Sequence, residues 1–215
     1  MSPRTRKVDW TQRCQQCWLH HALCLCDQFT PRPSTTRIVV VMDERESYQT
    51  TNTSHLAPLV LATAQLHVRN RHDRSDITQQ LNAPHLWMLY PGPEAETLAP
   101  PSDGHPVTLV VPDGTWRSTS RMIRRAPGLA PLPRVQLPPG PPARRWLRRP
   151  PNRQAVSTLE AIARAVAILE GDPQWEKELM RLLHTMIDRH LWSKGQIDAD
   201  KVTGGIPEAA LAHKG

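Results

Sequence analysis

Four cysteines near the N-terminus have the types and spacing of a metal site. They follow the pattern C-x2-C-x6-C-x-C at Cys14, Cys17, Cys24 and Cys26. Four thiolates this close together can close a tetrahedral zinc site, and C-x2-C is a usual half of one. Four protein ligands leave no open position for a substrate, so the spacing predicts a structural zinc ion. The alternatives to a zinc site are a redox pair or free thiols. His20 and His21, between the second and third cysteines, are possible substitute ligands.

A carboxylate, Asp113, is the second candidate for chemistry. It follows the apolar run Leu109-Val110-Val111, which indicates a buried strand, and Pro112 is expected to end that strand. Asp113 and Gly114 form a turn signal. Open α/β sheets bind ligands at the carboxyl ends of their strands, so Asp113 stands where a functional acid is expected.

A concentrated positive charge follows this acid. Between Gly114 and Leu159 the chain has ten arginines and no Asp, Glu or Lys. Because the whole chain carries +7, the remainder sums to 7 − 10 = −3, so the basicity is local. Arginine is a bidentate phosphate donor, which predicts a surface for a polyanion. The candidate contacts are Arg117, Arg121, Arg124, Arg125, Arg144, Arg145, Arg148, Arg149 and Arg153. A merely solvated basic loop is the alternative for residues 143–153.

Composition narrows the class of protein. The chain has 215 residues, enough for one domain with a small appendage. Its mean hydropathy is −0.50 and no apolar run approaches 18 residues, so no membrane span is expected. The basic N-terminus lacks an apolar segment and does not resemble a secretory signal, which favours a reducing, cytoplasmic location. No P-loop or G-x-G-x-x-G motif is present, which excludes those nucleotide-binding classes.

Strands and helices that would position these groups can be read from periodicity. Apolar runs predict strands at 37–42, 85–90, 109–111 and 134–137. Three of these runs stop at Pro91, Pro112 and Pro138, and such loops present backbone groups to a ligand. The acids of Asp43-Glu-Arg-Glu46 are either catalytic or, as we favour, part of a solvated loop. Residues 67–76 are polar and predict no regular element.

A short basic helix is expected at Ser118 to Arg125, and three further helices are expected elsewhere in the chain. The first follows the cap candidates of Thr50–Ser54, with Leu56, Leu59, Val60 and Thr63 buried. The second begins at a capping box formed by Ser157 and Glu160 and ends near Gly171. The third spans about 174–192. We expect a zinc-binding knuckle and linker at 1–34, a catalytic domain at 35–195, and a weakly ordered tail at 196–215.

The stretch Asp113-Gly-Thr-Trp116 resembles the D-x-T-W signature of the DTW-domain family. Other parts of the family pattern occur in the same order. They are the clustered cysteines at 14–26, Thr51-Asn-Thr53, Leu89-Tyr-Pro91, Arg121-Met122 and Ser157-Thr-Leu-Glu-Ala161. The resemblance covers roughly residues 14–190.

The resemblance implies an enzyme that uses S-adenosylmethionine (SAM). It implies transfer of the 3-amino-3-carboxypropyl group, not the methyl group, to N3 of a uridine in tRNA. It also implies a SPOUT-like α/β fold: a mostly parallel sheet with flanking helices, a C-terminal trefoil knot and a small N-terminal zinc knuckle. No membrane partner is expected. The oligomeric state is open, with a monomer slightly favoured.

Roles can then be assigned as expectations. The catalytic group would be Asp113, Thr115 and Trp116. Asp113 would accept a hydrogen bond from uracil N3–H and take the proton only as the new bond forms. Thr115 would have a structural role, and Trp116 would either stack on the target base or the adenine or pack in the core. The cofactor would be held by Leu89, Tyr90, Pro91, Pro112, Gly114, Leu137, Ser157, Thr158 and Glu160. Of these, the helix start at 157–160 would attract the cofactor's carboxylate, with help from Arg153 or Arg117.

Two other functions remain open from the sequence. One is an RNA methyltransferase of the same fold, which differs only in the group transferred. The other is a non-enzymatic zinc-knuckle RNA-binding protein, which explains the cysteines and arginines but not the D-x-T-W stretch.

Overall fold

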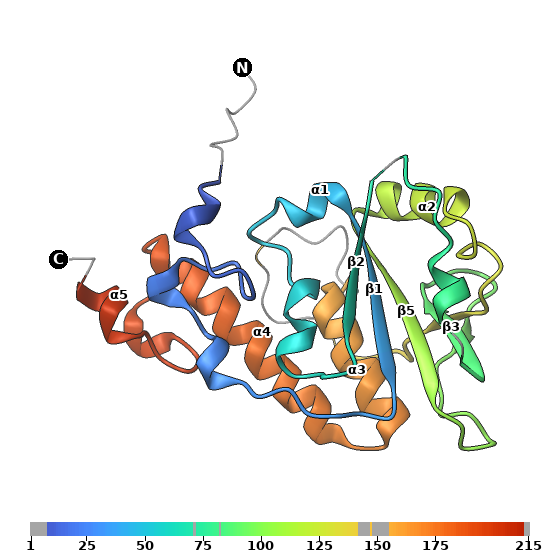
Figure 1. The fold of residues 1–215 in the computed structure, drawn as a ribbon. Coiled ribbons are helices and arrows are strands. Elements are labelled where there is room, and N and C mark those ends of the chain that lie inside the picture. The colour runs from blue at the N-terminus through green and yellow to red at the C-terminus, as the bar shows by residue number, and fades with distance from the viewer. Residues whose placement is uncertain (1–7, 71, 82, 142–146, 148–154, 213–215) are drawn as a thin grey trace.

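The computed structural model describes residues 8–70, 72–81, 83–141, 147 and 155–212 (Figure 1). Its centre is a six-stranded sheet in the order β2-β1-β5-β3-β6-β4. Every pairing in this sheet is parallel, which confirms the predicted parallel α/β class. The strands are β1 (Arg37–Asp43), β2 (Gln65–Arg69), β3 (His85–Leu89), β4 (Glu96–Thr97), β5 (Val107–Asp113) and β6 (Arg134–Gln136).

Helices cover the sheet and extend from it on one side (Figure 1). The α-helices are α1 (Glu44–Ser47), α2 (Trp116–Arg125), α3 (Thr158–Glu170), α4 (Pro173–Ser193) and α5 (Glu208–Ala212). Short 3-10 turns are η1 (Trp10–Gln12), η2 (His21–Leu23), η3 (Cys26–Gln28), η4 (Ser54–Leu59), η5 (Ile77–Gln80) and η6 (Ala199–Lys201). Among the described residues, no helix combines the length and apolar character needed to cross a bilayer.

Both faces of the central strands are buried, as expected for a parallel sheet. Ile38, Val40 and Met42 of β1 belong to the larger core, which also holds the inward faces of α3 and α4. Val39 and Val41 belong to a smaller core on the opposite face, which includes residues from η5 and the segment after α2. The alternation along β1 therefore fixes its position between the α3–α4 layer and the smaller cover formed by η5 and the segment after α2.

The two long helices match the prediction closely. Ser157 caps α3 by accepting a hydrogen bond from the Glu160 backbone N–H, and Gly171 ends the helix in a left-handed conformation. The inward stripe of α4 is buried as expected: Leu179, Leu182, Leu183, Met186 and Ile187. Local capping and 3.6-residue periodicity were sufficient to place both helices.

Three local expectations were wrong. Pro112 does not end β5 but lies inside it, paired with Val41. The register with β3 stops at Val110, so β5 has a single ladder partner beyond that point and tolerates a proline. The helix expected after Ser54 is a short 3-10 turn with Pro58 inside it, although its leucines are buried.

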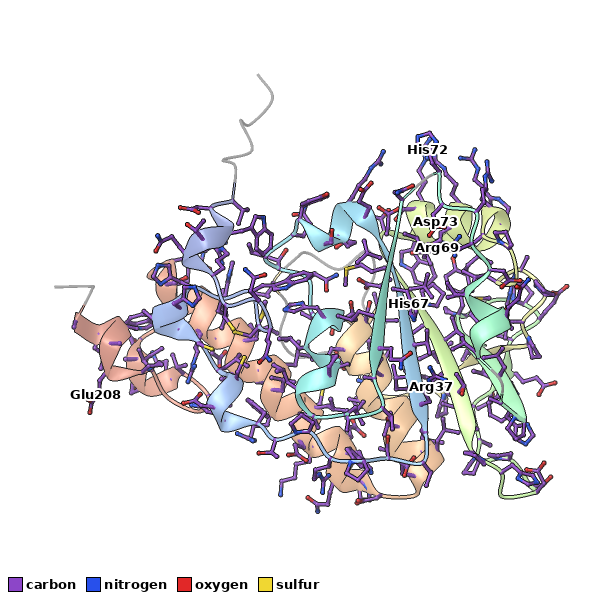
Figure 2. All side chains as sticks on the ribbon, in the orientation of Figure 1. Arg37, His67, Arg69, His72, Asp73 and Glu208 are labelled. Carbon is purple, nitrogen blue, oxygen red and sulfur yellow. The ribbon has the colours of Figure 1, made fainter. Side chains whose placement is uncertain are left out.

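The third is the edge strand β2, where no element was expected. Its residues are mostly exposed, so it lacks the apolar run that marks a central strand. Arg69 ends the strand and donates hydrogen bonds to the carbonyls of Asp73 and Ser75 at 3.1 and 2.8 Å. Figure 2 shows Arg69, His72 and Asp73 together at this end of β2.

The cysteine segment and the tail both pack against α4. Arg189 of α4, 1% exposed, donates hydrogen bonds to the carbonyls of Leu23, Cys24 and Gly205. Asp188 accepts hydrogen bonds from the backbone and hydroxyl of Thr203. The tail therefore has more structure than its composition indicates, and α5, with Glu208, forms the end of the molecule farthest from β2 (Figures 1 and 2).

Candidate functional site

A cavity of about 1060 Å³ opens at the carboxyl ends of β1, β5, β3 and β6. Parallel strands bring their carboxyl ends to one edge, which is where open α/β sheets bind ligands. The start of α3 closes the cavity, together with Leu183 and Ile187 of α4. Its volume is slightly above the usual range for small-molecule pockets, roughly 300–1000 Å³.

The loops expected to hold a cofactor converge on this cavity. Residues that line it include Leu89, Tyr90, Pro91, Pro112, Gly114, Leu137, Ser157 and Thr158. Pro138, Pro139 and Gly140 line it as well. Glu160 is not on the wall, but its carboxylate is bonded to a residue that is. Segments spread over about 70 positions of sequence thus form one concave surface.

Asp113 is the hub of a buried hydrogen-bond network in the cavity wall. Its side chain lies at the end of β5 and is only 5% exposed. One carboxylate oxygen accepts hydrogen bonds from Asn52 Nδ2 at 2.6 Å and Ser54 Oγ at 2.9 Å. The other accepts a short hydrogen bond from Thr158 Oγ1. The carboxylate therefore joins β5, the turn before η4 and the first residue of α3.

Arg164 supplies a positive charge to the same wall, a role that was not predicted from the sequence. It lines the cavity and pairs with Glu160 at 2.5 Å, one helical turn earlier on α3. Burial raises the pKa of Glu160, and the nearby Arg164 opposes that shift. The i, i+4 spacing of the two residues was the available signal. Together with the first turn of α3, Arg164 provides a place for a carboxylate.

Trp116 lies at the rim of the cavity and is 49% exposed. Its ring is tilted against Tyr90, with centroids 5.6 Å apart, and the Tyr90 hydroxyl bonds Ser120 at 2.8 Å. This position excludes core packing as the role of the indole. Thr115 caps α2 by accepting a hydrogen bond from the Ser118 backbone N–H.

The loop after β1 was expected to be solvated, but Glu46 in this segment is buried. Asp43 caps the short helix α1, which turns Glu46 inward to 7% exposure on the cavity wall. A four-residue helix is too short to show periodicity, so nothing in the sequence separated Glu46 from its acidic neighbours. Asn52 also lines the cavity; it belongs to the Thr51-Asn-Thr53 motif, but no role was predicted for it.

The arginines of α2 form an exposed stripe that begins beside the cavity. Arg117, Arg121, Arg124 and Arg125 are all exposed, and the first three are spaced at i, i+4 and i+7 on one helical face. The described part of the chain does not include Arg144, Arg145, Arg148, Arg149 or Arg153. The exposed arginines of α2 by themselves provide a positively charged surface that leads to Trp116.

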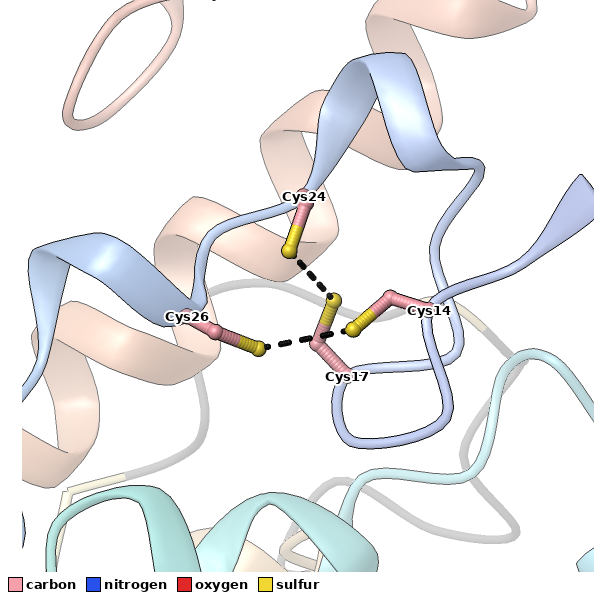
Figure 3. A group of neighbouring side chains, drawn as sticks. All are labelled: Cys14, Cys17, Cys24 and Cys26. Carbon is pink, nitrogen blue, oxygen red and sulfur yellow. Dashed lines mark hydrogen bonds between the residues drawn. The ribbon is translucent and has the colours of Figure 1, made fainter.

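The four cysteines gather as their spacing predicts (Figure 3). Their sulfur atoms all lie within 4.8 Å of one another, and none forms a disulfide. Cys14 and Cys26 are 3.7 Å apart at sulfur, and Cys17 and Cys24 are 3.8 Å apart. A tetrahedral zinc ion with bonds of about 2.3 Å places its sulfurs about 3.8 Å apart, so the cluster fits that ion.

The pKa values of the cysteine thiols also favour the binding of a cation. Hydrogen bonding from the Cys26 thiol is the main cause that lowers the pKa of Cys17 to about 5. Burial raises the pKa of Cys24. The cluster thus readily forms one thiolate, and a bound cation would stabilise the others. His20 and His21 are not part of this group of four sulfur ligands.

A profile of the DTW domain matches residues 11–191, which is most of the chain. The chain belongs to the DTW-domain family. The match spans the cysteine cluster, the network around Asp113, all of α3 and all but the last two residues of α4, so the DTW domain includes every part of the candidate site described above.

Three curated relatives of this DTW protein share one name, which states an enzymatic activity. It is 27% identical to tRNA-uridine aminocarboxypropyltransferase 2 of Drosophila melanogaster over 81% of this chain and 73% of the fly protein. It is 28% identical to the protein of the same name from Mus musculus, over 87% of this chain and 66% of the mouse protein. The relative from Macaca fascicularis is 24% identical over the same shares. No solved structure matches the chain significantly.

Proposed function

We propose that this protein transfers the 3-amino-3-carboxypropyl group of SAM to N3 of a uridine in tRNA. The observation that carries the proposal is the convergence of the DTW turn with the loops after β3 and β6 and the start of α3 on one cavity. Relatives named for this reaction support it. The reaction joins uracil N3 to the terminal carbon of the aminocarboxypropyl chain and breaks that carbon's bond to sulfur. Sulfur keeps the electron pair, and the N3 proton is released to solvent water.

The cavity wall divides into regions suited to the parts of the cofactor. Backbone groups around Pro91, Gly114 and Pro138 would hold adenine and ribose, because Pro- and Gly-rich loops expose peptide groups. The α3 start at Ser157–Thr158 and the guanidinium of Arg164 would hold the carboxylate. Holding both ends of the chain sets which carbon faces the nucleophile, and this choice separates aminocarboxypropyl from methyl transfer.

The target base would enter past Trp116. A half-exposed indole at the rim of a cavity is suited to stack on a uracil taken out of its helix. The tRNA backbone would follow the α2 arginines, which start next to this indole. Asp113 already accepts hydrogen bonds from Asn52, Ser54 and Thr158, so its main role would be to hold the wall in place rather than to remove the N3 proton.

Two further features belong to the proposal. The cysteine cluster would hold a structural zinc ion, because it offers four thiols and no open position. The SPOUT-like chain path with a C-terminal trefoil knot also stays a proposal, drawn from the family resemblance.

A double-label experiment tests the function. Purified protein would be incubated with unmodified bulk tRNA and SAM labelled either in the methyl carbon or in the aminocarboxypropyl chain. Label in RNA from the chain alone is the expected result, and nuclease mapping would then place it on a uridine. Label from the methyl carbon would mean an RNA methyltransferase. Binding of tRNA without either label would favour a zinc-knuckle RNA-binding protein.

A further inference from the structure

The indole of Trp18 lies flat on the imidazole of His55. The ring centroids are 3.7 Å apart and the planes differ by 4°. Trp18 directly follows Cys17 in the cysteine cluster, whereas His55 lies on η4, just after the Thr51–Thr53 segment that lines the cavity. The stack is therefore a direct contact between the candidate metal site and the domain that contains the candidate active site.

The backbone of the cysteine turn fixes where this indole points. Trp18 has a φ of 58° and is the sole non-glycine with positive φ among the residues described. Its N–H donates to the Cys14 carbonyl at 2.9 Å, which closes the C-x2-C turn. A bulky side chain rarely adopts this left-handed conformation, so it persists because the surroundings hold it. A metal bound by Cys14 and Cys17 would be one such restraint.

From His55 the contacts lead on to Asp113. His55 Nδ1 and its backbone N–H both lie 3.4 Å from Asn52 Oδ1. Asn52 Nδ2 donates to Asp113 at 2.6 Å. Ser54 Oγ bonds both Asn52 Oδ1 and Asp113, at 3.1 and 2.9 Å. All four residues are at most 5% exposed, so water does not readily replace these contacts.

We propose that Trp18 and His55 are positioning residues for the cavity. Through Asn52 they hold the Asp113 carboxylate in the orientation that the cofactor meets. Metal binding at the cysteines and SAM binding in the cavity are then coupled, and the coupling acts equally in both directions. This inference rests on the proposed function for the identity of the cofactor. The existence of the link itself does not depend on that identity.

Trp18→Leu tests the link, with Trp10→Leu as its matched control. Trp10 meets the edge of Trp18 with centroids 5.7 Å apart and makes no stack with His55. Both variants keep all four cysteines, so zinc content per chain should equal that of the wild type. SAM affinity, measured by calorimetry on zinc-loaded full-length protein, should fall on the order of ten-fold for Trp18→Leu. For Trp10→Leu it should stay within about two-fold, since the coupled stack remains.

A second readout follows the network without SAM. The side-chain amide resonance of Asn52, assigned with Asn52→Asp, should shift in Trp18→Leu toward its position in Asp113→Asn. A zinc-loaded Trp18→Leu protein with wild-type SAM affinity and an unmoved Asn52 amide would overturn the proposal. If wild-type protein binds no SAM, the proposed function fails, and the Asn52 amide still decides whether the link exists.

The wild type provides a test that needs no variant to fold. The zinc affinity, measured at equilibrium by competition with a chelator, should rise with saturating SAM, because the coupling of binding free energies is reciprocal. Equal zinc affinities with and without bound SAM would show that the two sites are independent and that the stack only fills space.

Discussion

Asn52 Nδ2 donates to Asp113 Oδ2 at 2.6 Å across 61 positions of sequence, inside the wall of the cavity. Asp113→Asn would replace an acceptor with a donor in front of groups that also donate. We expect a loss of about 1–3 kcal/mol in the free energy of unfolding, because a buried hydrogen bond becomes unsatisfied. Transfer activity should fall about 100-fold through misplacement of the wall. Urea unfolding and the labelled transfer assay measure the two effects.

The control for this variant is Asp198→Asn. Asp198 forms an exposed ion pair with Lys201, so the same chemical change there should alter neither stability nor transfer measurably. Wild-type transfer by Asp113→Asn would remove Asp113 from the functional site.

Trp116→Ala separates base stacking from cofactor stacking. Stacking on a base is worth about 1–3 kcal/mol, so kcat/KM for tRNA should drop roughly 5- to 150-fold. SAM affinity and stability should change little, and Trp116→Phe should retain most activity. Tyr48→Ala, at another exposed aromatic, is the control. A drop confined to SAM affinity would mean that the indole stacks on adenine instead.

The α2 stripe predicts a specific salt dependence. Arg121→Gln removes one exposed cation from that stripe, so the slope of log affinity for tRNA against log salt should become shallower by about 1. Lys177→Gln is the control, because it also removes one positive charge. Lys177 lies near the start of α4, and that end of the helix packs at the amino ends of the strands. Equal slopes for Arg121→Gln and wild type would place the RNA elsewhere.

The cysteine cluster predicts one zinc ion per chain. Cys24→Ser should lower the metal content measured by mass spectrometry and lower the denaturation midpoint, because binding free energy at such a site adds to folding free energy. His21→Ala should leave both unchanged, since His21 lies outside the cluster. Full metal content in Cys24→Ser would contradict the assignment of ligands.

His190 predicts a loss of stability in mild acid. Burial, with help from Lys194 and Arg13, lowers its pKa from 6.5 to about 4. The unfolded chain therefore binds the proton first, and this contribution to stability is lost as pH falls from about 6.5 toward 4. Urea midpoints at pH 7 and pH 5.5 should differ less for His190→Gln than for wild type. His105→Gln, at an exposed site, should behave like wild type.

Local patterns in the sequence were sufficient for some of this architecture. The cysteine spacing and the Ser157 cap each depend on neighbours within a few positions, and both are found as predicted. The turn expected at Asp113 is not, because Asp113 is the last residue of β5. The bond from Asn52 to Asp113 depends on two segments that meet only after the sheet has formed. No local pattern encodes that distance.

The same limit explains the missed edge strand and the missed acid. β2 gains its strand conformation from pairing with β1 rather than from an apolar run of its own. Glu46 is buried because α1 turns it onto the cavity wall, and its neighbours Glu44 and Arg45 share its polar composition. Composition alone assigns Glu44, Arg45 and Glu46 alike to solvent.

Arg189 also sets an order of events during synthesis. Its guanidinium fastens Cys24, which the ribosome makes 165 positions earlier. At translation rates of about 5–20 residues per second, roughly 10–30 seconds separate the emergence of these two residues. During that interval the four thiols are available to metal in the nascent chain, while the helix that will bury their backbone does not yet exist. Metal capture therefore precedes docking, and a cell short of zinc would release chains whose first segment has missed its turn.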